Sequence, residues 1–302
     1  MVDRRNIDCH LSLFPIKLSP PMNIWKIIIR ETIRPFRQLS QLLRKFYLWL
    51  CSHRLFQKVN SNILRLALQA RGYGNYPDIS ESGESHFLKQ IAREKPNLCI
   101  DIGANQGDYS AELLSHTASI VLAFEPQPSI FPRLREMQAQ YPQRFFPVNC
   151  GVGDKTGNLD LHYGDDRSCL ASFVAEINEI KSVGAVNTKI VNVPVVTLDQ
   201  FLDTQTLLKL PAHIDLLKID TEGFEMNVIL GALSTISKYK PKYIQVEISL
   251  QHMYTKTTLL DLSRQLQDYT VHQILPFGLT PVDPMDPLSN IFSYSNFAFI
   301  RK

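Results

Sequence analysis

The first residues with a pattern suited to chemistry form the segment Asp101-Ile-Gly-Ala-Asn-Gln-Gly107, which continues the apolar run Leu98-Cys-Ile. Glycine lets a backbone turn tightly and approach a ligand closely, and a helix that starts here would offer unpaired N–H groups. A Gly-x-x-x-Gly turn is also typical of an ordinary connection between a strand and a helix. The segment therefore indicates a ligand-binding turn only in combination with other residues.

Glu125 is one such residue, because it closes the next apolar run, Ile120-Val-Leu-Ala-Phe. In Rossmann-type domains an acidic residue about twenty positions after the glycine turn accepts hydrogen bonds from ribose hydroxyls. The alternative is a loop carboxylate exposed to solvent. Together, the turn and Glu125 predict a cofactor that contains adenosine.

The composition of the turn distinguishes between two cofactors that contain adenosine. Dinucleotide sites use close-packed glycines in the pattern Gly-x-Gly-x-x-Gly, whereas this turn reads Gly103-Ala-Asn-Gln-Gly107. The carboxylate of Asp101 suits an ammonium group and disfavours a phosphate. These features favour S-adenosylmethionine over NAD.

Three further carboxylates are candidates for catalysis. Asp220 and Glu222 follow one predicted strand and Glu247 lies near the end of the next, so all three can face the crevice beyond the carboxyl ends of the strands. A carboxylate there can remove a proton from a hydroxyl, or hold a magnesium or manganese ion that acidifies it. The alternative for Asp220 and Glu222 is to cap the helix that follows. His252 is a second candidate base, and we assign no residue as a metal ligand.

The elements that position these residues alternate between strands and helices, which argues for a doubly wound, mostly parallel sheet. Residues 151–196 interrupt the alternation, and we interpret them as an excursion beside the sheet. We expect strands over 98–103, 120–125, 145–149, 214–220, 243–248, 271–275 and 296–301, and helices over 86–93, 108–117, 129–140, 224–234 and 257–267.

Residues 1–72 differ from the rest of the chain in charge. They hold 13 Lys and Arg against 3 Asp and Glu, so the remainder carries a net charge of −7. Apolar residues at spacings of three and four predict helices over 22–70, divided at Pro35. Such a basic amphipathic segment can lie peripherally on an anionic membrane or pack against the catalytic domain. We take residues 1–72 as a helical segment and residues 73–302 as the catalytic domain.

The overall composition, with 302 residues and 44% hydrophobic residues, is typical of a folded globular protein. The five cysteines form no Cys-x-x-Cys pair, which favours reduced thiols. Basic residues interrupt every apolar stretch long enough to span a membrane, and no secretory signal is apparent. We therefore expect a cytoplasmic location, peripheral to the inner face of a membrane if the basic segment binds lipid.

The sequence resembles the FkbM-type methyltransferase family from about residue 72 to residue 302. Four motifs carry the resemblance: the Asp101–Gly107 segment, Phe124-Glu-Pro, Asn149-Cys-Gly-Val-Gly-Asp154 and Leu217-Lys-Ile-Asp-Thr-Glu-Gly-Phe-Glu225. The resemblance implies a class I methyltransferase fold, with a mostly parallel seven-stranded sheet that closes on an antiparallel strand. It also implies S-adenosylmethionine as methyl donor and O-methylation of sugars, glycolipids or natural products.

Carried over to this sequence, the resemblance implies that certain residues contact the cofactor. Asp101, Gly103, Asn105 and Gly107 would line its methionine and ribose side, Glu125 would bind its ribose, and Asn149 would lie near its adenine edge.

We therefore predict an S-adenosylmethionine-dependent O-methyltransferase that acts on a hydroxyl of a small-molecule or glycan acceptor. No specific nucleic acid partner is expected, and a divalent cation is an optional addition. Two other hypotheses are an NAD-dependent oxidoreductase and a non-catalytic module that docks on membranes or nucleic acid through its basic N-terminus.

Overall fold

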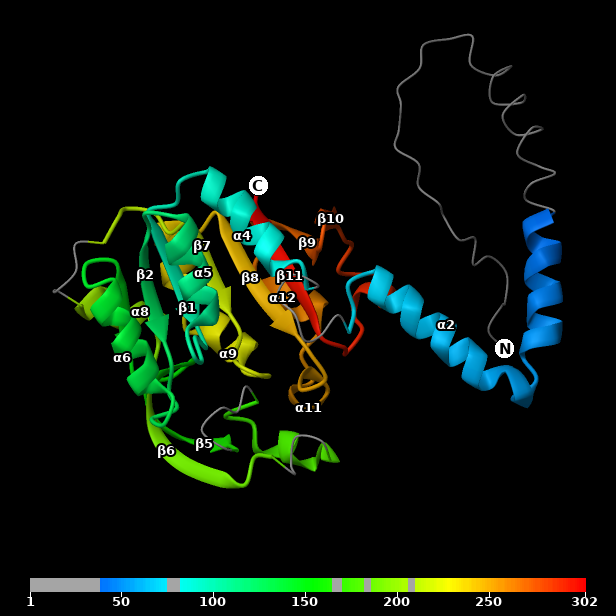
Figure 1. The fold of residues 1–302 in the computed structure, drawn as a ribbon, viewed down its shortest axis with the longest axis horizontal. Helices are drawn as coiled ribbons and strands as arrows, with labels where there is room; N and C mark the ends of the chain where they lie inside the picture. The colour runs from blue at the N-terminus through cyan, green and yellow to red at the C-terminus, as the bar shows by residue number, and fades with distance from the viewer. Residues whose placement is uncertain (1–38, 75–81, 165–169, 182–185, 206–209) are drawn as a thin grey trace, which may run out of the picture. The chain divides into compact units, whose positions relative to one another are not determined.

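The computed structural model describes residues 39–74, 82–164, 170–181, 186–205 and 210–302 (Figure 1). The chain divides into two compact units, Met1–Arg65 and Leu66–Lys302. The division falls inside helix α2 (Gln57–Ala70), a few residues before the boundary that we expected at residue 72.

The described part of the N-terminal unit is helical. A helix covers residues 39–51, and the short 3-10 helix η1 (Arg54–Phe56) leads into α2. The Tyr47 hydroxyl donates a hydrogen bond to Asn60 Oδ1 (2.7 Å), and Asn60 Nδ2 donates to the carbonyl of Cys51 (2.8 Å). No described helix is long and apolar enough to cross a bilayer. The expectations for residues 22–38, including the division at Pro35, lie outside the described residues.

The second unit is built on an eight-stranded sheet in the order β10-β9-β11-β8-β7-β1-β2-β3. Strand β11 runs antiparallel to both of its neighbours, β10 is the antiparallel hairpin partner of β9, and the other described pairings are parallel. The strands are β1 (Leu98–Ile102), β2 (Ile120–Phe124), β3 (Phe145–Val148), β7 (Leu216–Ile219), β8 (Tyr243–Ile248), β9 (Tyr269–Leu275), β10 (Gly278–Pro281) and β11 (Ser295–Arg301).

This arrangement confirms the expected α/β class and its antiparallel closing strand. The additional eighth strand, β10, was not expected. It has only four residues, begins with glycine and ends with proline, a composition that is unfavourable for strands and typical of turns.

Helices cover both faces of the sheet and give two apolar cores (Figure 1). One face carries α4 (Glu84–Arg93), α5 (Asp108–His116) and α6 (Phe131–Gln140). The other carries α8 (Leu198–Thr204), α9 (Glu225–Leu230), α10 (Leu233–Tyr239) and α12 (Leu259–Gln265). The short helices η2 (Ala175–Glu179), α11 (His252–Thr255) and η3 (Pro287–Ser289) lie in connections.

The expected single helix over 224–234 is wrong in one respect, because it breaks into α9 and α10. The break falls at Gly231 and Ala232, where the backbone packs against another segment: a Cβ on Gly231 would lie 1.9 Å from the carbonyl oxygen of Gly153. Close backbone approach of this kind requires glycine.

The excursion forms a separate three-stranded sheet in the order β4-β6-β5, as expected for a segment beside the main sheet. Its strands are β4 (Gly151–Val152), β5 (Gly157–Tyr163) and β6 (Lys189–Val196). Residues between β5 and β6 reach the carboxyl edge of the central sheet, since the Ser172 hydroxyl donates to the carbonyl of Glu222 (2.7 Å). The excursion therefore contacts the segment that follows β7 at this edge.

Candidate active site

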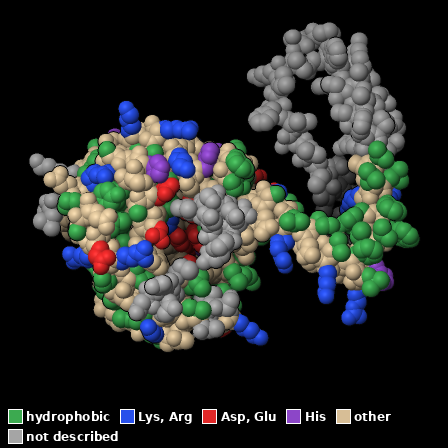
Figure 2. Space-filling view, in the orientation of Figure 1, with side chains coloured by type: hydrophobic (Ala, Val, Ile, Leu, Met, Phe, Trp, Pro, Cys, Tyr) green, Lys and Arg blue, Asp and Glu red, His purple; other side chains and the backbone are tan. Residues whose placement is uncertain are grey.

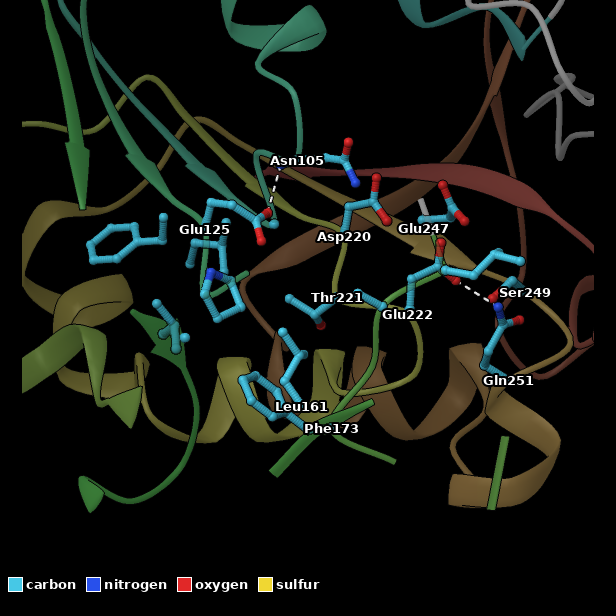
Figure 3. Close-up of a pocket in the computed structure, with 18 of the residues that line it drawn as sticks. Asn105, Glu125, Leu161, Phe173, Asp220, Thr221, Glu222, Glu247, Ser249 and Gln251 are labelled. Atoms are coloured by element: carbon cyan, nitrogen blue, oxygen red, sulfur yellow. Dashed lines mark hydrogen bonds between the residues drawn. The ribbon is translucent and has the colours of Figure 1, made fainter. Parts of the chain in front are cut away.

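A pocket of about 390 Å³ lies at the carboxyl edge of the central sheet. Acidic side chains gather inside a hollow on the corresponding face of the second unit (Figure 2). The connections after β1, β2, β7 and β8 form one side of the pocket, and the excursion forms the opposite side (Figure 3). Its lining includes Gly103, Asn105, Glu125, Asp220, Glu222 and Glu247. Six of the nine predicted site residues are thus brought together, and Asp101, Gly107 and Asn149 are not part of this lining.

The turn after β1 is held between two strand ends. Gly103 has a φ of +82°, and a Cβ there would lie 1.7 Å from the carbonyl oxygen of Asp220. The N–H groups of Gly103 and Ala104 both donate to the carbonyl of Phe124 (3.0 and 2.9 Å). The turn is therefore fixed close to the ends of β2 and β7, and only glycine fits at position 103.

Glu125 receives its hydrogen bonds from the backbone at both carboxylate oxygens. Asn105 N–H donates to Oε2 (2.8 Å) and Gln127 N–H donates to Oε1 (2.7 Å). The residue is 5% exposed, and burial raises the pKa of its carboxyl to about 7 even though these two backbone N–H groups lower it. Each oxygen keeps a second lone pair for a ligand hydroxyl.

Asn149 and Gly107 support this end of the pocket from outside. Asn149 Nδ2 donates to the carbonyl of Glu125 (2.8 Å). Gly107 precedes α5 with a φ of +87°, and a Cβ there would meet Met137 and Leu134 of α6 at 2.7 and 2.8 Å. Asn149 thus holds the backbone at Glu125 and Gly107 lets α5 begin close to α6, and neither residue lines the pocket.

Asp101 does not have the position that we expected. In β1 the side chains of Ile100 and Ile102 pack on one face of the sheet, so Asp101 points to the opposite face, where α5 lies. It is 1% exposed, accepts a hydrogen bond from Ser110 Oγ (2.6 Å), and lies 3.8 Å from Lys218 Nζ. Its carboxylate is consequently buried behind the pocket wall, because strand alternation overrides proximity in sequence.

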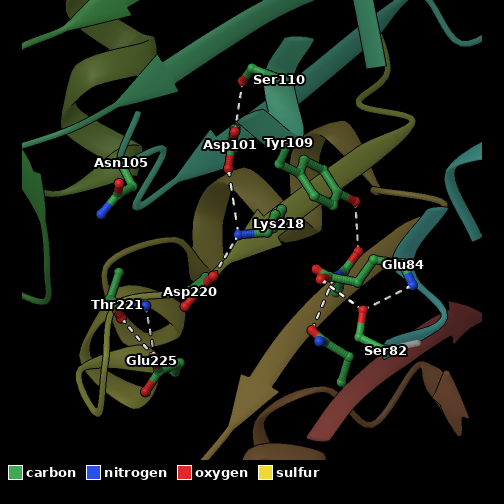
Figure 4. A network of polar contacts seen from close by, with 12 residues as sticks. Ser82, Glu84, Asp101, Asn105, Tyr109, Ser110, Lys218, Asp220, Thr221 and Glu225 are labelled. Carbon is green, nitrogen blue, oxygen red and sulfur yellow. Dashed lines mark hydrogen bonds and ion pairs between the residues drawn. The ribbon is translucent and has the colours of Figure 1, made fainter. Parts of the chain in front are cut away.

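Lys218 is the centre of a buried polar network (Figure 4). Its Nζ lies 2.8 Å from Asp220 Oδ2 and 4.9 Å from the centre of the Tyr109 ring. Burial lowers the pKa of Lys218, but the carboxylates of Asp220, Asp101 and Glu84 outweigh burial and raise it. Lys218 therefore keeps its charge and fixes Asp220 at the edge of the pocket.

The network also contains Glu84, which lines the pocket from the start of α4 and was missed by the sequence analysis. Gln245 Nε2 donates to Glu84 Oε1 (2.7 Å), and Ser82 Oγ donates to Oε2 (3.1 Å). Tyr109 in turn donates to Gln245 Oε1 (2.6 Å). Glu84 precedes every recognised motif and the helix predicted over 86–93, so no feature of its sequence position marks it as part of a pocket.

The three predicted catalytic carboxylates converge at the other end of the pocket from Glu125. Asp220, Glu222 and Glu247 each offer an oxygen within 4.8 Å of the other two. Gln251 Nε2 donates to Glu222 Oε2 (2.6 Å), whereas the Glu247 carboxylate has no hydrogen-bond or ion-pair partner among the described residues. The pKa values of both Glu222 and Glu247 are raised well above the usual range. Burial is the largest cause, and repulsion from the Asp220 carboxylate is the second.

Neither Asp220 nor Glu222 caps α9, which has no side-chain hydrogen bond at its N-cap, and the loop before this helix is held by Glu225. Glu225 Oε1 accepts from the N–H groups of Thr221 (2.8 Å) and Gly223 (3.2 Å). Asp220 bonds to Lys218 and Glu222 to Gln251. Their carboxylates are therefore directed to the pocket by side-chain partners.

His252 is a structural residue and not a pocket residue. Its Nε2 lies 2.9 Å from Glu225 Oε2, both side chains are 1% exposed, and its Nδ1 accepts from the N–H of Ser249 (3.2 Å). Burial would raise the pKa of Glu225, but His252 and the Thr221 N–H hold it below its usual value. The pair links the connections after β7 and β8, so the alternative of His252 as a base is wrong.

The excursion contributes an apolar wall opposite the carboxylates. Leu161, Leu170, Ala171 and Phe173 line the pocket from this side, and the Phe173 ring lies 5.3 Å from that of Phe224. From the sequence we expected the excursion beside the sheet but identified none of these residues, because nothing in an apolar side chain distinguishes a pocket wall from a core.

The chemistry of this site follows from its two ends. At one end the Glu125 carboxylate can accept hydrogen bonds from hydroxyl groups. At the other end the three carboxylates can accept protons or supply the oxygen ligands that magnesium and manganese prefer. The sheet order, the antiparallel β11 and a site at the carboxyl edge define a Rossmann-like fold of the class I methyltransferase type.

Comparison with protein families specifies the class further. The model of the methyltransferase FkbM domain matches residues 101–274, more than half of the chain, so the chain belongs to the FkbM methyltransferase family.

Several characterised relatives share part of the sequence. Methyltransferase 1 of Beauveria bassiana is 31% identical over 144 residues, 44% of this chain and 57% of the relative. Hexuronic acid methyltransferase AglP of Haloferax volcanii is 23% identical over 168 residues, 55% of this chain and 62% of the relative. The 2-O-methyltransferase NoeI of Sinorhizobium fredii is 28% identical over 171 residues, 53% of this chain and 67% of the relative.

Among solved structures, a methyltransferase FkbM from Methylobacillus flagellatus superposes with a TM-score of 0.42 at 17% identity, covering 79% of this chain and 60% of that one. The matches thus span about three fifths of the length of the first relatives.

Proposed function

We propose that this protein transfers a methyl group from S-adenosylmethionine to a hydroxyl of a sugar-containing or other small acceptor. The observation that carries the proposal is one continuous pocket with Glu125 and the glycine turn at one end and three carboxylates at the other. Such a pocket has room for a nucleoside and an acceptor side by side.

The residues at the first end fit the cofactor. Glu125 keeps free lone pairs for two ribose hydroxyls, and apolar side chains beside it, including Phe124 and Val152, suit a purine. Asp220 faces the pocket next to the glycine turn and suits an ammonium group, the role we first assigned to Asp101. The cofactor would supply an electrophilic methyl group, and these residues would hold it in a fixed orientation.

At the second end we assign Glu247 as the general base. Its carboxylate has no competing partner among the described residues, and its raised pKa makes it a stronger proton acceptor than an ordinary carboxylate. Glu222, held by Gln251, would orient the acceptor through its hydroxyl groups, while Asp220, held by Lys218, would stay with the cofactor. A divalent cation bound by the same three oxygens is the alternative way to activate the hydroxyl.

The lining supports a sugar as acceptor. Carboxylates accept hydrogen bonds from several hydroxyls, while Phe173 and Leu161 opposite them offer an apolar surface for the C–H face of a ring. One relative is named a hexuronic acid methyltransferase and another a 2-O-methyltransferase, and both names agree with a sugar as acceptor.

Calorimetry of the full chain with S-adenosylmethionine, S-adenosylhomocysteine and NAD tests the cofactor. We expect binding of the first two and none of NAD. Binding of NAD alone would favour the oxidoreductase hypothesis, and no binding of any of the three would favour a non-catalytic module.

The assignment of Glu247 as general base is tested by the rate at which S-adenosylhomocysteine forms with a panel of hexose and hexuronic acid glycosides. Glu247→Gln should slow turnover by about a hundredfold or more and leave S-adenosylhomocysteine affinity within about twofold. The exposed Glu136→Gln is a matched control and should have no effect. Full activity of Glu247→Gln would reject this base, and loss of wild-type activity on addition of a chelator would favour the cation.

A further inference from the structure

The helix over 39–51 has an amphipathic surface with a wide apolar side. With about 100° between successive residues, seven large side chains fall within one half of its circumference. This apolar face consists of Leu39, Leu42, Leu43, Phe46, Tyr47, Trp49 and Leu50. All seven are exposed, with Trp49 at 78% and Phe46 at 60%. Figure 2 shows these hydrophobic side chains in green.

The charges around this face have one sign. From residue 32 to residue 77 the sequence contains no Asp or Glu. In the helix itself, Arg44 and Lys45 fall on the two sides of its polar half, and Arg54, Lys58 and Arg65 follow along the unit. Within the described residues 39–74, the apolar face is therefore accompanied by basic charges and no acidic ones.

A second apolar stripe lies on α2, where Val59, Ile63 and Leu66 recur at spacings of four and three and are all at least half exposed. No residue of α2 is fully buried. Isolated exposed apolar residues are ordinary, but contiguous apolar surface of this kind marks a binding site for a protein or a membrane.

We propose that the N-terminal unit docks on the surface of an anionic lipid bilayer, with the helix over 39–51 lying in the plane of the interface. Amphipathic helices with a basic polar side and tryptophan or phenylalanine on the other side insert their apolar face to the depth of the headgroups. Trp49 and Tyr47 are the residue types that prefer this depth, and each nearby Lys or Arg adds attraction to acidic lipids.

The same observations disfavour two other partners. Pairing of the face with that of a second copy would bury the apolar side chains but give Arg44 and Lys45, on the polar half, no acidic partner from the same segment, because residues 32–77 contain no Asp or Glu. A nucleic acid would engage the basic residues but leave the apolar face in water. An anionic bilayer satisfies both the charge and the apolar surface.

Co-sedimentation of the full chain with vesicles tests the proposal. We expect binding to phosphatidylcholine vesicles that contain phosphatidylglycerol, much weaker binding to pure phosphatidylcholine, and weakening when salt is raised. Equal sedimentation with both vesicle types, or with neither, would overturn the proposal.

The helix offers a matched pair of variants. Leu43→Gln lies on the apolar face and should weaken partitioning onto the acidic vesicles by about tenfold. Leu48→Gln makes the same chemical change on the opposite side of the helix, where the side chain is also exposed, and should change partitioning by less than about twofold. Equal losses in both variants would contradict the assigned face.

Light scattering of the same proteins without lipid tests the competing partner. The wild type should have the same mass as Leu43→Gln. A wild-type dimer that Leu43→Gln converts to a monomer would overturn the proposal and assign the face to a second copy. None of these outcomes depends on methyl transfer, so they are distinct from the tests of the proposed function.

Discussion

At the scale of single residues, Glu125 connects the electrostatics of the site to a measurable pH dependence. Burial raises the pKa of its carboxyl from 4.5 to about 7. Below pH 4.5 the carboxyl is protonated in both the folded and unfolded chain, and above 7 it is ionised in both. Between these two pH values only the folded chain retains the proton. The free energy of unfolding therefore falls as the pH rises through this range. A ligand that donates hydroxyl hydrogens to the carboxylate favours the ionised form.

We therefore predict that affinity for S-adenosylhomocysteine rises with pH up to about 7 and is constant above. Below this pH it should fall by about tenfold per unit once Glu125 is protonated. Calorimetry across this range gives the curve. The Glu125→Gln variant should bind at least about tenfold more weakly and show no such step, and a step of the same size in the variant would assign the pH dependence to another group.

The position of Glu125 in the pocket could be predicted from the sequence, whereas the positions of some other residues could not, and the reason is physical. Glu125 and Gly103 follow the ends of buried strands, and the ends of parallel strands meet at one edge whatever the details of packing. Asp101 lies one strand position before that edge, where alternation decides which face its side chain takes. Glu84 and Phe173 reach the pocket only through tertiary packing, which no local pattern reports.

At the scale of elements, Gly231 joins the pair of helices α9 and α10 to the excursion. A Cβ at this position would lie 1.9 Å from the Gly153 carbonyl oxygen, and that backbone has no room to move without shifting β4 or α9. Gly231→Ala should therefore destabilise the folded chain by about 2 kcal/mol or more, the range of overpacking in a filled core. A chemical denaturation curve measures this change.

Gly157 provides the control for that prediction. It lies at the start of β5, and a Cβ there would meet no atom within 4 Å. Gly157→Ala makes the same covalent change and should be neutral or slightly stabilising, by up to about 1 kcal/mol. Similar destabilisation by both alanines would mean that Gly231 has no special packing role.

The elements themselves were largely predictable. Apolar runs in the second unit correspond to β1, β2, β7 and β8 because strands buried on both faces need such runs. The break between α9 and α10 was not predictable, since the sequence around Gly231 is compatible with a continuous helix and the cause of the break is a contact with Gly153, far away in sequence.

At the scale of the whole molecule, the charge distribution and the packing divide the chain at nearly the same place, residue 72 for charge and residue 65 for packing. Residues 1–72 carry a surplus of ten positive charges and residues 73–302 a net charge of −7. The residues that line the described pocket all fall between Glu84 and Tyr294. The second unit, Leu66–Lys302, thus contains the complete described pocket and both apolar cores.

A chain that starts at Leu66 should accordingly fold cooperatively and bind S-adenosylhomocysteine within about twofold of the full chain. A chain that starts at Tyr73, the boundary expected from charge alone, lacks Leu68, which packs against the core and accepts a hydrogen bond from the Tyr73 N–H (2.9 Å). Loss of a partly buried leucine should lower the stability of this shorter chain by about 1 to 2 kcal/mol. Thermal melts of the two chains decide between the boundaries, and equal melting temperatures would favour residue 72. Failure of both chains to bind S-adenosylhomocysteine would mean that the N-terminal unit completes the site.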